Sequence, residues 1–146
     1  VAFDAGGVME LDDGGSDAYG YNPDTPLPLT VSAESTASAA IFVGDNPRKD
    51  SPEEAILFIR TDRTALFGLN VNGVKVENQK PEYVNLFNRG NNLKEGQMVY
   101  AFILPASCLK QGNNEISLQS VQSESFKVKR LEIAMKYGDV KTHGYF

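Results

Sequence analysis

The sequence predicts an all-β protein whose strands form an antiparallel two-sheet β-sandwich. Three observations support this fold class. Apolar and polar residues alternate along many short segments, as they do in a strand with one buried face. Clusters of Gly, Asn, Asp and Pro separate these segments at short intervals, as turns do. Apolar residues with helical spacing are rare, and about nine short strands are enough for two packed sheets.

The elements are expected in the following order. The first 28 residues are rich in Gly, Asp, Pro and Tyr, which predicts an irregular N-terminal loop region, 1–28, within a single domain that spans residues 1–146. Strands are then expected in LTVSAE (29–34), SAAIFVG (38–44), AILFIRT (55–61), ALFGLNV (65–71), VKVEN (74–78), EYVNLF (82–87), MVYAFIL (98–104), NEISLQSV (114–121) and FKVKRLEIAMKY (126–137).

Three of these elements carry specific signals. Asn72-Gly73 lies between two alternating segments and accepts the positive φ angles of a two-residue hairpin turn. The nearly continuous apolar run 55–61 predicts a central strand buried on both faces; the alternative is a buried helix that begins at Ser51-Pro52-Glu53-Glu54. A break in the alternation near Arg130 predicts a β-bulge in the last strand.

Composition excludes several classes of function. The net charge of −5 disfavours a nucleic-acid partner, because phosphate binding needs a basic surface. No run of 18 apolar residues that could span a membrane is present. The single cysteine, Cys108, cannot form an intrachain disulfide and is expected to be a small buried residue. The sequence starts at Val1 without a signal peptide, so we expect a mature or excised module of a larger protein.

Signatures of catalysis are mostly missing, so we expect a protein that is not an enzyme and requires no cofactor. A Ser-His-Asp arrangement would need His143, the only histidine, and no Gly-x-Ser-x-Gly elbow occurs. One histidine and one cysteine do not make a zinc site, and the Gly-rich segments lack the Lys-Ser/Thr of a phosphate loop. A pair of carboxylates for glycoside cleavage stays open, since 19 acidic residues are available.

Acidic clusters offer a possible calcium site. Asp12, Asp13 and Asp17 supply the oxygen ligands that Ca²⁺ prefers, although their spacing is not that of a helix-loop-helix calcium site. The alternative is a solvated turn stabilised by Asp and Gly. Asp45, Asn46 and Asp50 form a second, weaker candidate.

Aromatic residues next to polar loop residues point to a carbohydrate site. An aromatic ring contacts the C–H face of a sugar, while Asn and Arg side chains bond its hydroxyls. The alternative is that the tyrosines are core residues and the asparagines only form turns. The candidate carbohydrate-binding residues are Tyr19, Tyr21, Tyr83, Asn85, Asn88, Arg89, Asn91 and Asn92. The chain contains no Trp, which argues against a flat platform for crystalline cellulose.

Two segments carry a family resemblance. ALFGLNVNGVKV (65–76) and YAFILPASCLKQGNNEISLQSV (100–121), followed by FKVKRLEIAM (126–135), resemble galactose-binding-like jelly-roll modules of the kind attached to polysaccharide lyases and glycoside hydrolases. The matching positions of the second segment are Tyr100, Phe102, Leu104, Pro105, Leu109, Lys110, Gly112, Asn114, Ile116 and Leu118. The resemblance implies a jelly-roll-like β-sandwich in which these residues build turns and core.

The residues and the resemblance together favour a non-catalytic carbohydrate-binding module, or accessory module, of a secreted bacterial glycan-degrading protein. The expected partners are a polysaccharide or oligosaccharide and an adjoining catalytic module, outside the cell or at its surface. One alternative is a structural or protein-interaction β-sandwich that binds no sugar. The other is a small polysaccharide lyase or hydrolase.

Overall fold

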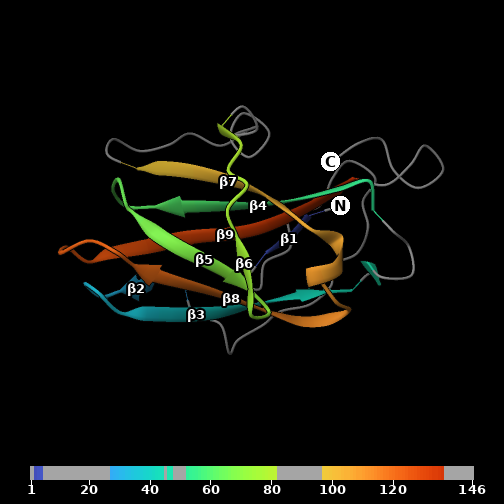
Figure 1. The fold of residues 1–146 in the computed structure, drawn as a ribbon, viewed down its shortest axis with the longest axis horizontal. Coiled ribbons are helices and arrows are strands. Elements are labelled where there is room, and N and C mark those ends of the chain that lie inside the picture. Colours follow the sequence, from blue (N-terminus) through green and yellow to red (C-terminus); the bar gives the residue numbers. More distant parts are fainter. Residues whose placement is uncertain (1, 5–26, 45, 48–51, 82–96, 137–146) are drawn as a thin grey trace.

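The protein is a sandwich of two antiparallel sheets, as the sequence predicts (Figure 1). The structure is a computed structural model that describes residues 2–4, 27–44, 46–47, 52–81 and 97–136. In the first sheet, β4 (Glu54–Thr61) lies between β7 (Met98–Leu104) and β9 (Phe126–Lys136). On its other side, β9 pairs with two short strands, β1 (Ala2–Asp4) and β2 (Leu29–Val31).

The second sheet has the strand order β3-β8-β5-β6. Its strands are β3 (Thr36–Val43), β8 (Gly112–Ser120), β5 (Phe67–Val71) and β6 (Val74–Val76). A short 3₁₀ turn, Ala106–Cys108, follows β7 directly after Pro105. In the described part of the chain, no helix has the length and apolarity to cross a membrane.

The main core lies between the two sheets, and β4 is buried on both faces. Its residues Leu57 and Ile59 belong to the cluster between the sheets. Ile56 and Phe58 point to the other face, where they pack with buried residues of β7 and β9. Burying each such side chain contributes about 1.5–3 kcal/mol relative to exposure. The interpretation of 55–61 as a central strand is therefore confirmed, and the helical alternative is wrong.

The predicted bulge in the last strand is also present. The pairing of β4 with β9 shifts by one residue, since Arg60 pairs with Arg130 and Thr61 pairs with Val128. Side chains alternate between the two faces of a strand, so an extra residue exchanges the faces beyond it. Val128 and Leu131 are an odd number of positions apart and would face opposite sides of a regular strand. Because of the shift, both belong to the core cluster between the sheets.

The Asn72-Gly73 turn forms the predicted hairpin between β5 and β6. Its φ angles are 50° at Asn72 and 81° at Gly73, the geometry of a type I′ turn, and Val71 pairs with Val74 across it. The side chain of Asn72 has a second role. Its Nδ2 donates to the Cys108 carbonyl (2.7 Å) and to Asn114 Oδ1 (2.8 Å), and its Oδ1 accepts from the Glu115 amide (2.9 Å).

Asn114, the third residue of β8, completes this network and binds the turn before that strand. It is fully buried, and its Nδ2 donates to the carbonyls of Lys110 (2.9 Å) and Gly112 (3.0 Å). Its Oδ1 accepts from the Lys110 amide (2.9 Å) as well as from Asn72. A buried polar group without such partners would cost about 1–3 kcal/mol. The hairpin turn and the turn before β8 are therefore one hydrogen-bonded unit.

Strand boundaries differ from the prediction where side chains or turns replace sheet pairing. The segment 29–34 is a strand only to Val31, because a turn follows in which the Ser35 amide and hydroxyl both donate to the Ser32 carbonyl. β5 begins at Phe67, since the amides of Ala65 and Leu66 donate to side chains instead. β8 begins two residues early, at Gly112, which pairs with Val43. The predicted strand 82–87 lies outside the described residues.

Replacing Asn72 separates its two roles. Asn72→Gly keeps the positive φ but removes the side-chain hydrogen bonds, and we expect it to lower the free energy of unfolding by about 1–3 kcal/mol. Asn72→Ala loses the same hydrogen bonds but keeps a Cβ in the left-handed region, so it should cost about 1 kcal/mol more than Asn72→Gly. Urea denaturation of the wild type and the two variants measures both contributions, the lost hydrogen bonds and the backbone strain. Equal stability of all three would contradict the role given to this side chain.

Candidate functional site

A groove opens along one edge of the sandwich, between the β5–β6 hairpin and β7. β6 is the edge strand of the second sheet and β7 is at the edge of the first. The groove is lined by residues 64–69, 75–77, 79, 98, 100 and 102, and its volume is about 510 Å³. This volume lies within the range of small-ligand sites in proteins.

The chain crosses from one sheet to the other beside this groove. After β6 it passes in front of the sandwich toward β7 (Figure 1), and Gln79 forms an isolated bridge with Phe102. The Lys80 amide donates to the Ala101 carbonyl (2.7 Å), and the Ile103 amide donates to the Asn78 carbonyl (2.8 Å). These bonds fix the crossing segment against β7, so the groove has a defined wall on this side.

Aromatic rings form the floor of the groove. Phe67 and Tyr100 are half-buried and meet edge to face, with ring centroids 5.3 Å apart and an interplanar angle of 89°. Behind them, the rings of Phe102 and Phe126 lie 6.0 Å and 5.7 Å from that of Phe67. The Tyr100 hydroxyl accepts a hydrogen bond from the Ala65 amide (2.9 Å). The rings are therefore held in place and keep part of their apolar surface accessible.

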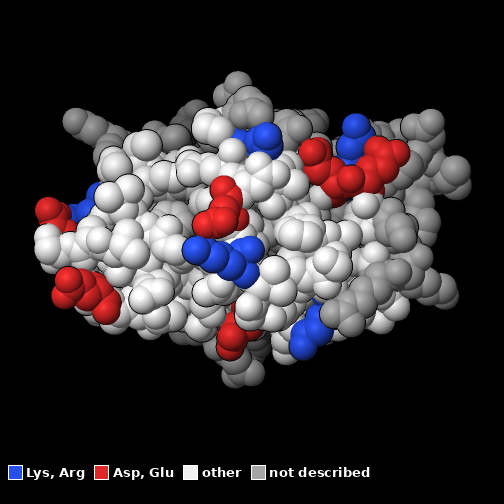
Figure 2. Space-filling view, viewed as in Figure 1, with Lys and Arg blue, Asp and Glu red and all other residues white. Residues whose placement is uncertain are grey.

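The rim carries polar groups beside exposed apolar side chains, and its charges balance. Thr64 and Gln79 contribute an exposed hydroxyl and an exposed amide. Lys75 Nζ lies 3.2 Å from Glu77 Oε1, and both side chains are largely exposed, so the pair adds little stability but compensates charge locally. Figure 2 shows the face that bears β5, β6 and β7 in Figure 1, with charged side chains scattered over a mainly uncharged surface.

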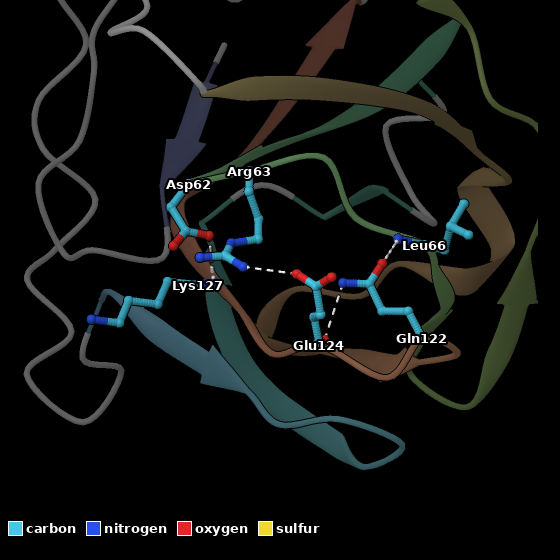
Figure 3. Close-up of polar contacts among 6 residues, drawn as sticks. All are labelled: Asp62, Arg63, Leu66, Gln122, Glu124 and Lys127. Carbon is cyan, nitrogen blue, oxygen red and sulfur yellow. Dashed lines mark hydrogen bonds and ion pairs between the residues drawn. The ribbon is translucent and has the colours of Figure 1, made fainter.

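A set of hydrogen bonds fixes the end of the groove near β9 (Figure 3). Gln122 Oε1 accepts from the Leu66 amide (2.9 Å), and Arg63 Nη1 contacts Glu124 Oε2 at 3.1 Å. Asp62 Oδ1 accepts from the Lys127 amide (2.8 Å). These contacts connect the segment between β4 and β5 to the turn between β8 and β9. They order residues 62–66, of which 64–66 line the groove.

Charged side chains are few in the described lining of the groove. Glu77 is the one carboxylate among the described residues that line it. Cys108 is buried outside the groove; burial raises the pKa of its thiol, and a weaker backbone hydrogen bond lowers it. The described residues contain no group of three or more His, Cys, Asp or Glu side chains placed to hold a metal ion.

An ion pair between a buried carboxylate and a partly buried arginine lies on the outer face of the first sheet. Arg130 Nη2 lies 3.2 Å from Glu132 Oε2, and Glu132 is 3% exposed. Phe58, which pairs with Glu132, belongs to the apolar cluster on this face. Removing one partner from a buried pair costs about 3–5 kcal/mol because the other charge stays buried. This pair therefore belongs to the packing of the sheet.

The residues predicted from the sequence to bind sugar or calcium lie outside the described residues. This applies to Tyr19, Tyr21, Tyr83, Asn85, Asn88, Arg89, Asn91 and Asn92, to Asp12, Asp13 and Asp17, and to Asp45 and Asp50. Of the weaker calcium candidates, Asn46 is described and half-buried. Those predictions stay untested.

The groove itself was missed by sequence reasoning. Phe67, Tyr100 and Phe102 alternate with other residues along their strands, so the pattern indicates core and gives no sign of an accessible surface. The strand after Asn72-Gly73 is predicted over residues 74–78, but it ends at Val76. This short strand leaves little of the second sheet at its edge, so aromatic residues beside it stay partly uncovered.

Solved structures share this fold within larger proteins. A β-porphyranase of glycoside hydrolase family 86 from the human gut bacterium Bacteroides plebeius matches 75% of this chain and 19% of its own, with 16% identity and a TM-score of 0.51. A protein named BuGH86, solved in complex with neoagarooctaose, matches 76% of this chain and 18% of its own, with 21% identity and a TM-score of 0.50. The chain thus spans about a fifth of the length of either protein.

A smaller structure was also found, a CBM35 from Cellvibrio japonicus Abf62. It aligns over 94% of this chain and 91% of its own, with 16% identity and a TM-score of 0.42. No protein-family model and no curated protein matches the chain. At the level of the fold, the expected jelly-roll-like β-sandwich is confirmed.

The buried thiol of Cys108 leads to two expectations. Native protein should react with a thiol reagent at least about 100-fold more slowly than unfolded protein, because labelling requires opening of the core. Stability should fall as the pH rises above about 8.5, since the unfolded thiol loses its proton before the folded one, whose pKa is raised. Cys108→Ala should remove this part of the pH dependence. Rapid labelling of the native protein would contradict the assignment.

Proposed function

We propose that this chain is a non-catalytic carbohydrate-binding module that serves as an accessory part of a secreted glycan-degrading protein. The groove with its fixed, partly accessible aromatic rings and polar rim is the observation that carries the proposal. The comparisons support the context, because the same fold makes up part of a β-porphyranase and part of a protein solved with neoagarooctaose.

The chemistry of a sugar explains why such a groove suits it. One face of the sugar ring consists of C–H groups that pack on an aromatic ring, while the hydroxyls at its edge need donors and acceptors. A shallow site of this kind binds weakly, with an expected dissociation constant between about 1 μM and 1 mM, or −8 to −4 kcal/mol. Attachment to a catalytic module would raise the local concentration of that module at its polymer.

The loop residues predicted from the sequence remain part of the proposal. Tyr19 and Tyr21, and the group around Tyr83 and Arg89, are proposed as further sugar contacts. Asp12, Asp13 and Asp17 are proposed as a calcium site, for which the expected sign is a lower melting temperature in a chelator.

A second candidate function is a protein-interaction domain that binds no sugar. It is favoured by exposed apolar side chains beside the groove. Leu66 and Val121 are each 64% exposed and are joined by a backbone hydrogen bond (3.2 Å), and Met98 on the opposite wall is 37% exposed. Apolar surface of this kind is also common at protein interfaces.

Affinity electrophoresis distinguishes the two functions. Native polyacrylamide gels are cast with agarose-type galactan, xylan, mixed-linkage β-glucan, pectin or alginate. We expect at least one polysaccharide to retard the chain, and no release of reducing or unsaturated sugars from it. Uniform mobility in all gels would contradict sugar binding and favour the interaction domain, while product release would indicate a lyase or hydrolase.

Substitution of the loop tyrosines tests the sequence-based contacts. If Tyr19 or Tyr83 stacks on the sugar, its replacement by Ala should weaken retardation by about five- to tenfold. Wild-type retardation of both variants would exclude these two residues as contacts and leave the function itself in place.

A further inference from the structure

We infer that the groove between the β5–β6 hairpin and β7 is the ligand subsite, and that it takes an uncharged sugar unit in preference to a sulfated or carboxylated one. This inference rests on the proposed carbohydrate-binding function. It adds the place of binding and the charge class of the ligand.

The aromatic floor is already organised for binding. Phe67 and Tyr100 meet at 89°, and neither ring is free to turn away: Phe67 packs on Phe102 and Phe126, while the Ala65 amide holds the Tyr100 hydroxyl. A contact made by fixed rings costs little conformational entropy on binding. Both residues are half-buried and line the groove, so part of each stays accessible.

The rim supplies hydrogen-bonding groups next to this floor. Thr64 and Gln79 are exposed, and their backbones are ordered by neighbouring contacts. Gln79 lies in the crossing segment that is bonded to β7, and Thr64 follows the segment held by Asp62 and Arg63. A hydroxyl and an amide can each donate and accept, which matches the hydroxyl groups of a sugar.

The charges of the groove favour a neutral ligand. Its described lining holds one cation and one carboxylate, Lys75 and Glu77, which lie 3.2 Å apart and compensate each other. The nearest arginine in sequence, Arg63, contacts Glu124 at 3.1 Å. Recognition of sulfate or carboxylate groups normally uses an arginine or lysine directed at the anion. The chain as a whole carries a net charge of −5, which further disfavours a polyanion.

The test uses the full chain and matched substitutions. Phe67→Leu removes a ring from the floor but keeps an apolar side chain, and Gln79→Ala removes an exposed amide from the rim. Phe42→Leu is the control, because Phe42 is an exposed phenylalanine (41%) on β3, outside the groove. Affinity electrophoresis is run with neutral polymers (agarose-type galactan, xylan and β-glucan) and with anionic polymers (carrageenan and polygalacturonate). Thermal unfolding and size-exclusion chromatography of each variant check fold and association.

Binding of a neutral polymer is expected to weaken about five- to tenfold in Phe67→Leu and about threefold in Gln79→Ala, while Phe42→Leu stays within twofold of the wild type. Glu77→Gln leaves the Lys75 charge without its partner. It should therefore raise the ratio of anionic to neutral affinity severalfold at low salt, and the gain should disappear at high salt. If Phe67→Leu does not fold, Gln79→Ala alone tests the position of the site. The Gln79 side chain is exposed, so its removal should leave the fold intact.

The remaining outcomes overturn the inference in distinguishable ways. Wild-type retardation of both groove variants would move the site elsewhere and leave the proposed function standing. Tighter binding of carrageenan or polygalacturonate than of every neutral polymer would overturn the charge class. No retardation by any polymer would overturn the inference and the proposed function together. If the wild-type chain is a dimer and Phe67→Leu is a monomer, the groove would be assigned to contact with a second copy of the chain.

Discussion

The hydrogen bond between the side-chain amides of Asn72 and Asn114, together with the bonds that both amides make to the backbone, holds together the part of the sandwich on which the groove depends. Asn72 forms the turn of the β5–β6 hairpin, and Asn114 anchors the turn before β8. Because β6 is only three residues long, the chain leaves the second sheet early and crosses to β7. The hairpin, the crossing segment and β7 then enclose a space that neither sheet fills. A local turn signal is in this way connected to the groove that is proposed to bind a ligand.

Much of the fold follows from local signals in the sequence. The hairpin at Asn72-Gly73, the central strand at 55–61 and the bulge near Arg130 each depend on a few neighbouring residues, and all three are confirmed. Strand ends were harder to predict. At Ala65 and Leu66 the backbone amides bond to Tyr100 and Gln122, which lie 35 and 56 positions away, and no local pattern contains that information.

The groove could not be predicted for the same reason. Phe67 and Tyr100 are far apart in the sequence, and each belongs to an alternating strand that indicates core. Their contact depends on which strands form the sheet edges, and this is a property of the whole topology. From the sequence, sugar-binding aromatics are predicted in polar loops, where tyrosines lie next to asparagines. The structure adds aromatics that belong to strands and are left accessible by a short neighbouring strand.

Residue-resolved binding data test the central claim most directly. Amide chemical shifts of the full chain are followed by NMR during titration with a neutral oligosaccharide, neoagarooctaose, or with a soluble fragment of whichever neutral polymer retards the chain. Binding in the groove predicts the largest shift changes in residues 64–69, 75–79 and 98–102, with small changes along β3. Shift changes confined to other parts of the chain, or no change at millimolar oligosaccharide, would contradict the assignment of the groove as the sugar site.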